Sequence, residues 1–464
     1  MTTERDLSRR GIVAAMAAGA TLAPILGPGE AMAAGKPRSS RYGSIIDAAE
    51  HGVSPDLTKD QTAALQRAVD LAAERSAPLH LPAGRYLVNG VRLRPGSRLH
   101  GAGPATVLAG TDTGPILAAT ATDALHLSDL CIDGAFVPLG SGNHPGLLAL
   151  DRCAGFSIER MTIKRSAANG ISLVACSGRI THTSVAEARD AAIFSLDADP
   201  ATGALAISQC RISDCADNGI LIWRTASGHD GSRVLDTTIE RIGNRSGGSG
   251  QYGNGVNVFR AGSVSVSNCF IAHCSYSAIR GNAASNILMS ANQIAHISEV
   301  ALYAEFGFEG ALIANNVIEH AATGIAVTNF NEGGRLAVVQ GNLVRNLFRR
   351  EHEPVDKRGD GIAVEADAVV SGNVIEGAPT AGILIGWGPY MRNVAATGNL
   401  VREAGIGIAV STVSGVGRCL LANNMIVSAR HGAIRAMDHD KPVSADLTRV
   451  PSHAGITLQG NVTT

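Results

Sequence analysis

The sequence predicts an all-β solenoid, a parallel β-helix, and three observations support this prediction. A phrase of roughly 25 residues recurs from about Gly203 to the C-terminus, and units of that length need neighbours on both sides to bury their apolar faces. Each unit holds short runs of alternating apolar residues between Gly, Asn and Asp turns, which is typical of strands. The repeated units show neither helical periodicity nor a regular leucine frame. The clearest units read GALAISQCRISDCADNGILIWR, ALIANNVIEHAATGIAVTN, AVVSGNVIEGAPTAGILIG and VAATGNLVREAGIGIAVST.

Composition, the third observation, favours the same fold. The chain has 464 residues with 54 glycines and 4% aromatic residues, and small or β-branched residues dominate its apolar 45%. Such residues fit a narrow core of stacked coils. The 39 basic and 40 acidic residues are scattered without a basic stripe, which argues against nucleic acid as a partner.

The region before the repeats predicts a short helix that caps one end of the solenoid. Residues Thr58 to Gln61 have the form of a capping box, and apolar residues follow at helical spacing to about Glu74. Such a helix would block the open strand edges and shield the core of the first coil. The positions expected to face the core are Leu65, Ala68, Val69 and Ala72.

The first 33 residues have the features of an export signal. Leu7-Ser8-Arg9-Arg10 precedes an apolar segment from Gly11 to Leu26 and an Ala31-Met32-Ala33 box, and together these resemble a twin-arginine signal peptide. The alternative is a disordered tail. We therefore expect a signal peptide at 1–33, the cap and first coils at 34–110, and the repeats at 111–464. We therefore expect a bacterial protein that the twin-arginine translocase exports to the periplasm or beyond. We expect no stable insertion into the membrane.

The eight cysteines predict core-filling side chains, with a disulfide framework as the alternative in an exported protein. No CxxC pair is present, and four cysteines fall in strand-like runs at the spacing of the coils. They are Cys153, Cys176, Cys210 and Cys269.

Two stretches resemble known families. DLTKDQTAALQRAVDLAA, followed by LHLPAGRYLVNGVRLRPGSRLHGAG, resembles the opening of pectate-lyase-like proteins. VALYAEFGFEGALIANNVIEHAATGIAVTNFNEGGRLAVVQGN is similar to a narrower family of twin-arginine-translocated repeat proteins. The resemblance covers essentially the whole mature chain and implies a right-handed parallel β-helix, while it leaves the chemistry open.

Aligning the coils on Gly-Ile-x-Val separates inward from outward side chains, because side chains alternate along a strand. One inward file is expected at Ile220, Val256, Ile279, Leu302, Ile325 and Ile362. The outward positions are Trp223, Asn257, Phe259, Arg280, Asn282, Tyr303, Glu305, Thr328 and Glu365. This alignment makes Arg280 a neighbour of Tyr303 and places Glu305 beside Asn282.

A second file holds three histidines on successive coils. Stacked imidazoles could bind a metal, but a ladder climbs in a line whereas zinc needs convergent ligands. The alternatives are turn-stabilising surface residues and residues that bind sugar or transfer protons, and neither a resident metal nor a cofactor is predicted. The file reads Asp214, Arg241, His273, His296, His320 and Asn346.

Two long polar insertions interrupt the repeat at one corner, from Gly243 to Gly253 and from Leu347 to Gly359. Long loops in a compact fold are usually functional or disordered. Three coils with tight turns separate these insertions, so we expect them to flank a floor on the order of 20 Å wide. The floor would carry Arg280, Tyr303, Glu305, Asn329 and the three histidines.

Such a floor suits an extended acidic polysaccharide. Arg280 could neutralise a uronate carboxylate, and Tyr303, His296 and Glu305 are the candidate catalytic groups for lyase- or epimerase-type proton abstraction. The expected substrate-binding residues are Asn257, Phe259, Asn282, Asn329, His273 and His320.

Hydrolysis is less well supported, because a glycosidase needs two carboxyl groups within about 10 Å of each other. The alignment puts Glu305 and Glu365 three coils apart, near about 14 Å by strand spacing. The polygalacturonase motifs are missing, and Met437 to Lys441 only faintly resembles an alginate-epimerase motif. The alternative to an enzyme is a non-catalytic glycan-binding or envelope structural protein.

Overall fold

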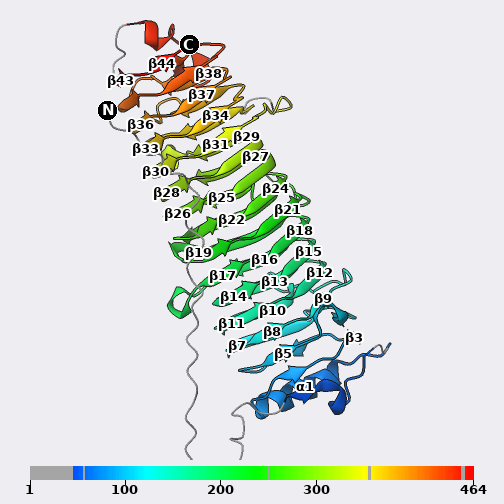
Figure 1. Cartoon of the computed structure of the whole chain (residues 1–464). Coiled ribbons are helices and arrows are strands. Elements are labelled where there is room, and N and C mark those ends of the chain that lie inside the picture. Colours follow the sequence, from blue (N-terminus) through cyan, green and yellow to red (C-terminus); the bar gives the residue numbers. More distant parts are fainter. Residues whose placement is uncertain (1–44, 56–57, 249, 354–356, 451–454) are drawn as a thin grey trace, which may run out of the picture. The chain divides into compact units, whose positions relative to one another are not determined.

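The computed structural model describes residues 45–55, 58–248, 250–353, 357–450 and 455–464, all within one compact unit, Gly43–Thr464. Its strands stack into a parallel β-helix with three faces (Figure 1). The predicted signal segment, 1–33, lies outside the described residues. No helix among those described is long and apolar enough to cross a membrane.

The first face is one 16-stranded sheet in which each strand pairs with its equivalent in the next coil. Its strands are β1 (Ile46–Asp47), β2 (Leu79–His80), β5 (Arg98–His100), β8 (His126–Ser128), β11 (Phe156–Glu159), β14 (Gly178–Thr181), β17 (Leu205–Ser208), β20 (Arg233–Leu235), β23 (Ser265–Ser267), β26 (Ile287–Ser290), β28 (Glu309–Ala314), β30 (Arg335–Gln340), β33 (Ala366–Ser371), β36 (Arg392–Thr397), β39 (Cys419–Ala422) and β43 (Ile456–Gln459).

The second face follows the first around a corner of the coil. Its strands are β3 (Gly84–Leu87), β6 (Thr106–Ala109), β9 (Cys131–Asp133), β12 (Thr162–Ser166), β15 (Ser184–Ala188), β18 (Arg211–Cys215), β21 (Thr238–Ile242), β24 (Phe270–Cys274), the first parts of β27 and β29, β31 (Leu343–Arg345), β34 (Val374–Glu376), β37 (Leu400–Arg402), β40 (Met425–Val427) and β44 (Val462–Thr463).

The third face carries the Gly-Ile-x-Val strands. They are β4 (Val91–Arg92), β7 (Leu117–Asp123), β10 (Gly146–Ala154), β13 (Asn169–Val174), β16 (Ala191–Leu196), β19 (Asn218–His229), β22 (Asn254–Gly262), β25 (Ile279–Asn282), β27 (Gln293–Glu305), β29 (Val317–Val327), β32 (Asp360–Val364), β35 (Ala381–Ile385), β38 (Ile406–Ser411) and β41 (Ile434–Asp438), which pairs antiparallel with β42 (Lys441–Pro442). β27 and β29 are long because each bends from the second face into the third.

The predicted inward file is confirmed. Strand pairing joins its six members in the expected order, and all six side chains are fully buried. All eight cysteines are also buried and unpaired, as the core-filling interpretation predicted.

The capping helix is α1 (Thr62–Glu74), and its buried residues are the four predicted ones. They join the main core cluster, so the helix does cover the first coils. The predicted capping box is wrong, because the helix begins later and Gln61, its N-cap residue, makes no side-chain cap. Asp60 Oδ1 instead accepts a hydrogen bond of 2.6 Å from the backbone N–H of Thr62.

A buried asparagine ladder, which the sequence analysis did not predict, lines the corner between the first and second faces. Each amide Nδ2 donates to a backbone carbonyl, and all but the last also donate to the Oδ1 of the next asparagine at 2.9–3.0 Å. The ladder consists of Asn292, Asn316, Asn342, Asn373, Asn399, Asn424 and Asn461.

The described part of the chain also contains five short 3-10 turns. They are η1 (Ala48–His51), η2 (Gly103–Ala105), η3 (Pro200–Thr202), η4 (Phe330–Glu332) and η5 (Leu447–Arg449).

Candidate functional site

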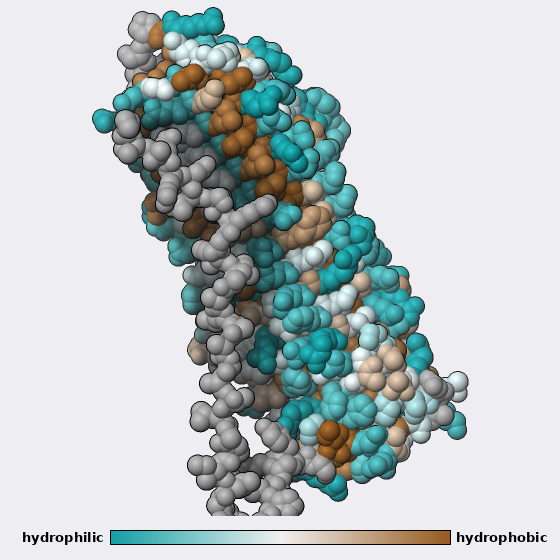
Figure 2. All heavy atoms as spheres, viewed as in Figure 1, coloured by the Kyte–Doolittle hydropathy of each residue, from teal (hydrophilic) through white to brown (hydrophobic). Residues whose placement is uncertain are grey.

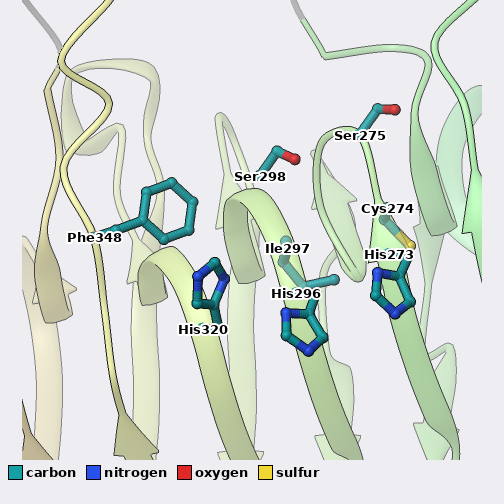
Figure 3. Close-up of a pocket in the computed structure, with 8 residues that line it drawn as sticks. All are labelled: His273, Cys274, Ser275, His296, Ile297, Ser298, His320 and Phe348. Carbon is teal, nitrogen blue, oxygen red and sulfur yellow. The ribbon is translucent and has the colours of Figure 1, made fainter.

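Three histidines form a row on the outside of the corner between the second and third faces (Figure 3). The ring centroids of His273 and His296 are 4.7 Å apart with planes 8° from parallel, and those of His296 and His320 are 5.0 Å apart. The ring of Phe348 continues the row at 4.9 Å from His320. The sequence alignment of this file is thereby confirmed, and Phe348, from the second insertion, is an addition to it.

The backbone explains why these side chains share one position. His273, His296 and His320 all have φ between 55° and 59°, in the left-handed region, because the chain turns there into the third face. Asp214, Arg241 and Asn346 adopt the same conformation at equivalent positions. The turn of the backbone therefore explains why these residues occupy equivalent positions.

The row borders a hollow of about 300 Å³, which Ser275 and Ser298 also line. The three imidazoles climb in a line along the coils, as Figure 3 shows. Among the described residues, no group of three His, Cys, Asp or Glu side chains is arranged to hold a metal ion. The donor set of the hollow instead offers ring faces and two hydroxyl groups to a ligand.

Arg280, Tyr303, Glu305 and Asn282 lie together on the third face, as the alignment predicted. Arg280 Nε contacts Glu305 Oε1 at 2.6 Å, and Asn282 Nδ2 donates to the same oxygen at 2.9 Å. The guanidinium carbon of Arg280 is 5.3 Å from the centre of the Tyr303 ring. However, Arg280 is only 8% exposed and Glu305 2%, so this part of the floor is covered rather than open.

The covering comes from the two insertions. A Cβ atom at Gly250 would lie 1.5 Å from Arg280 Nη1, so a larger residue there would displace the Arg280 side chain, and φ of 131° also favours glycine. Asn257 is buried here, and its Nδ2 donates to the carbonyl of Gln251 at 3.2 Å. The Tyr276 hydroxyl donates to the carbonyl of Gly248 at 2.9 Å.

Glu299 joins the second insertion to the floor, and the sequence analysis missed it. Arg358 Nη2 donates to Glu299 Oε1 at 3.1 Å, and Arg350 and Arg280 nitrogens lie 3.9 and 4.0 Å from its carboxylate. Burial raises the pKa of Glu299, although the three guanidinium groups act in the opposite direction. The signal available in the sequence was one extra residue in this coil: Ser298 and Glu299 stand opposite the single residue Ala322, where the strand register shifts between Ile297 and Val300.

Burial also raises the pKa of Tyr303, to about 12, with the Glu305 carboxylate adding to the effect. Tyr303 therefore stays protonated across the physiological range. Its ring is the one that Arg280 and Arg358 both approach.

The remaining predicted residues lie away from the histidine row. Phe259 is half-buried on the third face, between Trp223, at 5.9 Å between ring centroids, and the guanidinium of Arg260. Asn329 lies beyond the far end of β29, where its Oδ1 accepts from the backbone N–H of Phe306 at 3.3 Å.

Glu365, which directly follows β32 of the third face, is also a buried carboxyl group. Burial raises its pKa to about 7, while hydrogen bonds from the backbone N–H groups of Phe330 and Asn329 act in the opposite direction. The expected three-coil separation from Glu305 is wrong, because the pairing places only Thr328 between them. Two strand spacings correspond to about 10 Å. Glu305 is nevertheless held by Arg280, so the pair offers no free carboxylate couple for hydrolysis.

Comparison with known proteins agrees with the fold. A family model described as "Right handed beta helix region" matches residues 229–401. No curated protein matches the sequence. The N-terminal fragment of bacteriophage phi29 gene product 12 is 15% identical, with 90% of this chain and 71% of that chain covered and a TM-score of 0.51.

Two further solved structures are less similar in space. The catalytic unit of the GH87 alpha-1,3-glucanase from Streptomyces thermodiastaticus strain HF3-3 is 16% identical, covers 93% of this chain and 71% of its own, and gives a TM-score of 0.47. The A-module of the Azotobacter vinelandii mannuronan C-5 epimerase AlgE6 is 13% identical. The match covers 90% of this chain and 99% of that chain, with a TM-score of 0.37. Such identities concern the fold alone, and the chain is a right-handed parallel β-helix.

Proposed function

We propose that this protein binds an acidic, uronate-containing polysaccharide at the corner between its two insertions. The observation that supports this most directly is the row formed by His273, His296, His320 and Phe348 along one hollow. Ring faces at a regular spacing suit sugar rings, and imidazole groups become cationic when they are protonated. The hydroxyl groups of Ser275 and Ser298 supply hydrogen-bonding partners for sugar hydroxyls.

Cationic side chains lie close in sequence to two residues that line this hollow. Ser298, which lines it, directly precedes Glu299, and Phe348 lies two residues before Arg350. The guanidinium groups of Arg350, Arg358 and Arg280 surround Glu299. A uronate carboxylate that reached this point would meet the planar donors that recognise carboxylates best. This supports an acidic rather than a neutral glycan.

The chemistry that these residues support best is lyase- or epimerase-type proton transfer. In this proposal His296, at the centre of the row, takes the C5 proton beside the uronate carboxylate, while the arginine cluster of Arg280, Arg350 and Arg358 neutralises that carboxylate. In a lyase the electron pair forms the C4=C5 double bond as the C4–O bond breaks, and the leaving oxygen is protonated. In an epimerase a proton is instead returned to C5 from the opposite face. Tyr303 is a proton donor rather than a base, because its pKa is raised to about 12. Arg280 and Glu305 hold each other at 2.6 Å and so position the Tyr303 ring.

A non-catalytic glycan-binding protein is the second candidate, and one observation favours it. Arg280, Glu305 and Glu299 are all nearly fully buried and already engaged with protein groups, so they would need rearrangement before they could act on a substrate. We further infer export by the twin-arginine translocase to the periplasm or beyond, as the segment at 1–33 predicts, and kinship with the twin-arginine-translocated repeat proteins.

The proposal is tested with polyuronide oligosaccharides, using their uncharged reduced analogues as the matched ligand control. Titration calorimetry should detect binding of the charged ligand, with at least about tenfold weaker binding to His296→Ala. His182→Ala is the protein control, because His182 is also exposed with positive φ but lies at another corner. Unsaturated products reveal a lyase, and solvent deuterium incorporated beside the carboxylate reveals an epimerase. Binding without either indicates the second candidate, and equal binding by both variants contradicts the site.

A further inference from the structure

The corner between the first and second faces changes character along the solenoid. Outward positions of the first face in the N-terminal half include Ser157, Arg179, Ala206, Arg233 and Ser265 in one register column. From β26 onward the same column is apolar in six successive strands. It reads Leu288, Leu312, Val338, Val369, Ala395 and Leu420.

The second face shows the same change. One outward column reads Thr162, Ser184, Arg211 and Thr238 in the N-terminal half. It continues mainly with apolar side chains, several of them 38–55% exposed. These are Phe270, Gln293, Val317, Leu343, Val374, Leu400, Met425 and Val462.

The residues between these two columns carry no charge from β26 to β40. In each coil a small or amide side chain ends the first-face strand and Gly, Ala or Asn follows at the turn. Hydrophobic residues gather in an oblique row over the C-terminal coils in Figure 2, whereas the N-terminal coils are mostly hydrophilic there. An aliphatic, uncharged face of this size on an otherwise polar surface marks an interaction site. We name it the aliphatic face.

We propose that the aliphatic face is the contact between two copies of this chain, packed with their solenoid axes antiparallel. The charged column beside it supports this arrangement. Glu319, Arg345, Glu376 and Arg402 follow one another there, with ion pairs of 2.9 Å between Glu319 and Arg345 and between Glu376 and Arg402.

Reversing that column exchanges the signs of its charges. In an antiparallel pair Glu319 faces Arg402 of the second copy, and Arg345 faces Glu376. The two-fold axis then passes between β31 and β34, so every charge meets an opposite charge. The same point is the centre of both apolar columns, with three strands of the first face and four of the second on each side. A two-fold contact needs a self-complementary surface of this kind.

Other occupants fit the aliphatic face less well. A polysaccharide-binding face would present several aromatic side chains, but the two columns of this face consist of Val, Leu, Met and Ala apart from Phe270 and Gln293 near one end. A lipid surface would be met by a basic rim, whereas the neighbouring column alternates in sign and is internally paired. A second copy supplies both the aliphatic rows and the complementary charges.

Sedimentation of the mature protein across a concentration series tests the proposal, and a dimer is the expected result. Val374→Glu and Met425→Glu place a charge within the contact, so self-association should weaken at least about tenfold. Ser184→Glu is the matched control, because it occupies the same column in the N-terminal half. Circular dichroism should not change in any variant, since none of these side chains is buried within the chain's own core. The melting temperature of the two contact variants should fall at most to that of the wild type at concentrations where it is monomeric, because only the contribution of the contact is lost. A protein that is monomeric at every concentration, or a dimer insensitive to both variants, overturns the proposal.

Cross-linking tests the antiparallel arrangement. Val374→Cys lies beside the proposed axis, about one strand spacing from its counterpart, so a short bismaleimide should join two copies. Val317→Cys is the control, because its counterpart lies three spacings away, about 14 Å along the axis. The native cysteines are buried and should not react. Efficient cross-linking of Val317→Cys, or none of Val374→Cys in a dimer, contradicts the antiparallel arrangement.

Discussion

The buried carboxyl group of Glu365 makes the stability of the fold depend on pH. Its pKa is raised to about 7, from an ordinary value of 4.5, because burial disfavours its charged form. The unfolded chain therefore releases this proton at lower pH than the folded chain does. The Glu365 contribution to stability falls as pH rises from about 4.5 to about 7, and its full cost is present above pH 7.

Glu365→Gln removes that cost while it keeps an oxygen for the backbone N–H of Phe330. The variant should unfold at a higher temperature than the wild type at pH 8, by an amount equivalent to a few kcal/mol, and at a similar temperature at pH 4. Calorimetric melts of both proteins at the two pH values measure this. An equal gain at both values would mean that ionisation of Glu365 is not the cause.

Arg280 and Glu305 illustrate a buried pair in which each partner neutralises the other. Arg280→Ala leaves Glu305 buried without its cation, so unfolding free energy should fall by about 3–5 kcal/mol. The variant that replaces both, Arg280→Met with Glu305→Leu, should recover much of that loss, because neither partner of the pair leaves an uncompensated charge. Denaturant unfolding compares the three proteins. Arg280→Ala with wild-type stability would show that the pair is not buried as described.

At the level of elements, the asparagine ladder distinguishes this solenoid from a simple stack of apolar strands. Asn373 is fully buried, and its amide donates to Asn399 Oδ1 and to the carbonyl of Val339, while its Oδ1 accepts from Asn342. The ladder thereby satisfies backbone and side-chain groups at a buried turn.

Asn373→Ala breaks the ladder in its middle and leaves buried partners unsatisfied. We expect a loss of about 2–4 kcal/mol in unfolding free energy. Asn461→Ala at the end of the ladder is the matched control and should cost less, because Asn461 is only partly buried. Urea titration of both variants measures the difference, and equal losses would argue against a cooperative ladder.

These elements also show how much could be predicted from the sequence. The Gly-Ile-x-Val phrase gave the register of the third face correctly, since a period of two fixes which side chains point inward. The asparagines were visible in recurring Gly-Asn and Asn-Asn pairs, but a turn residue on the surface and one buried in a ladder look alike in sequence. The packing of the insertions on Arg280 and Glu299 depends on contacts between residues up to 59 positions apart, which no local pattern encodes.

At the scale of the molecule, two surfaces of the same solenoid are assigned different tasks. The corner between the second and third faces holds the histidine row and the arginine cluster, and the corner between the first and second faces holds the aliphatic face. Both surfaces are rows of equivalent residues, because each position of one coil has a counterpart directly above and below it in the neighbouring coils. Function is expected where that repetition is broken by an insertion or changes in polarity.

The central claim is that the histidine row between the insertions binds an acidic glycan. A crystal structure of the mature protein with a bound oligouronide tests it most directly. We expect sugar rings against His296 and His320, with a carboxylate directed toward Arg350 or Arg358. An oligouronide bound on another face, with the histidine row left to solvent, would contradict it.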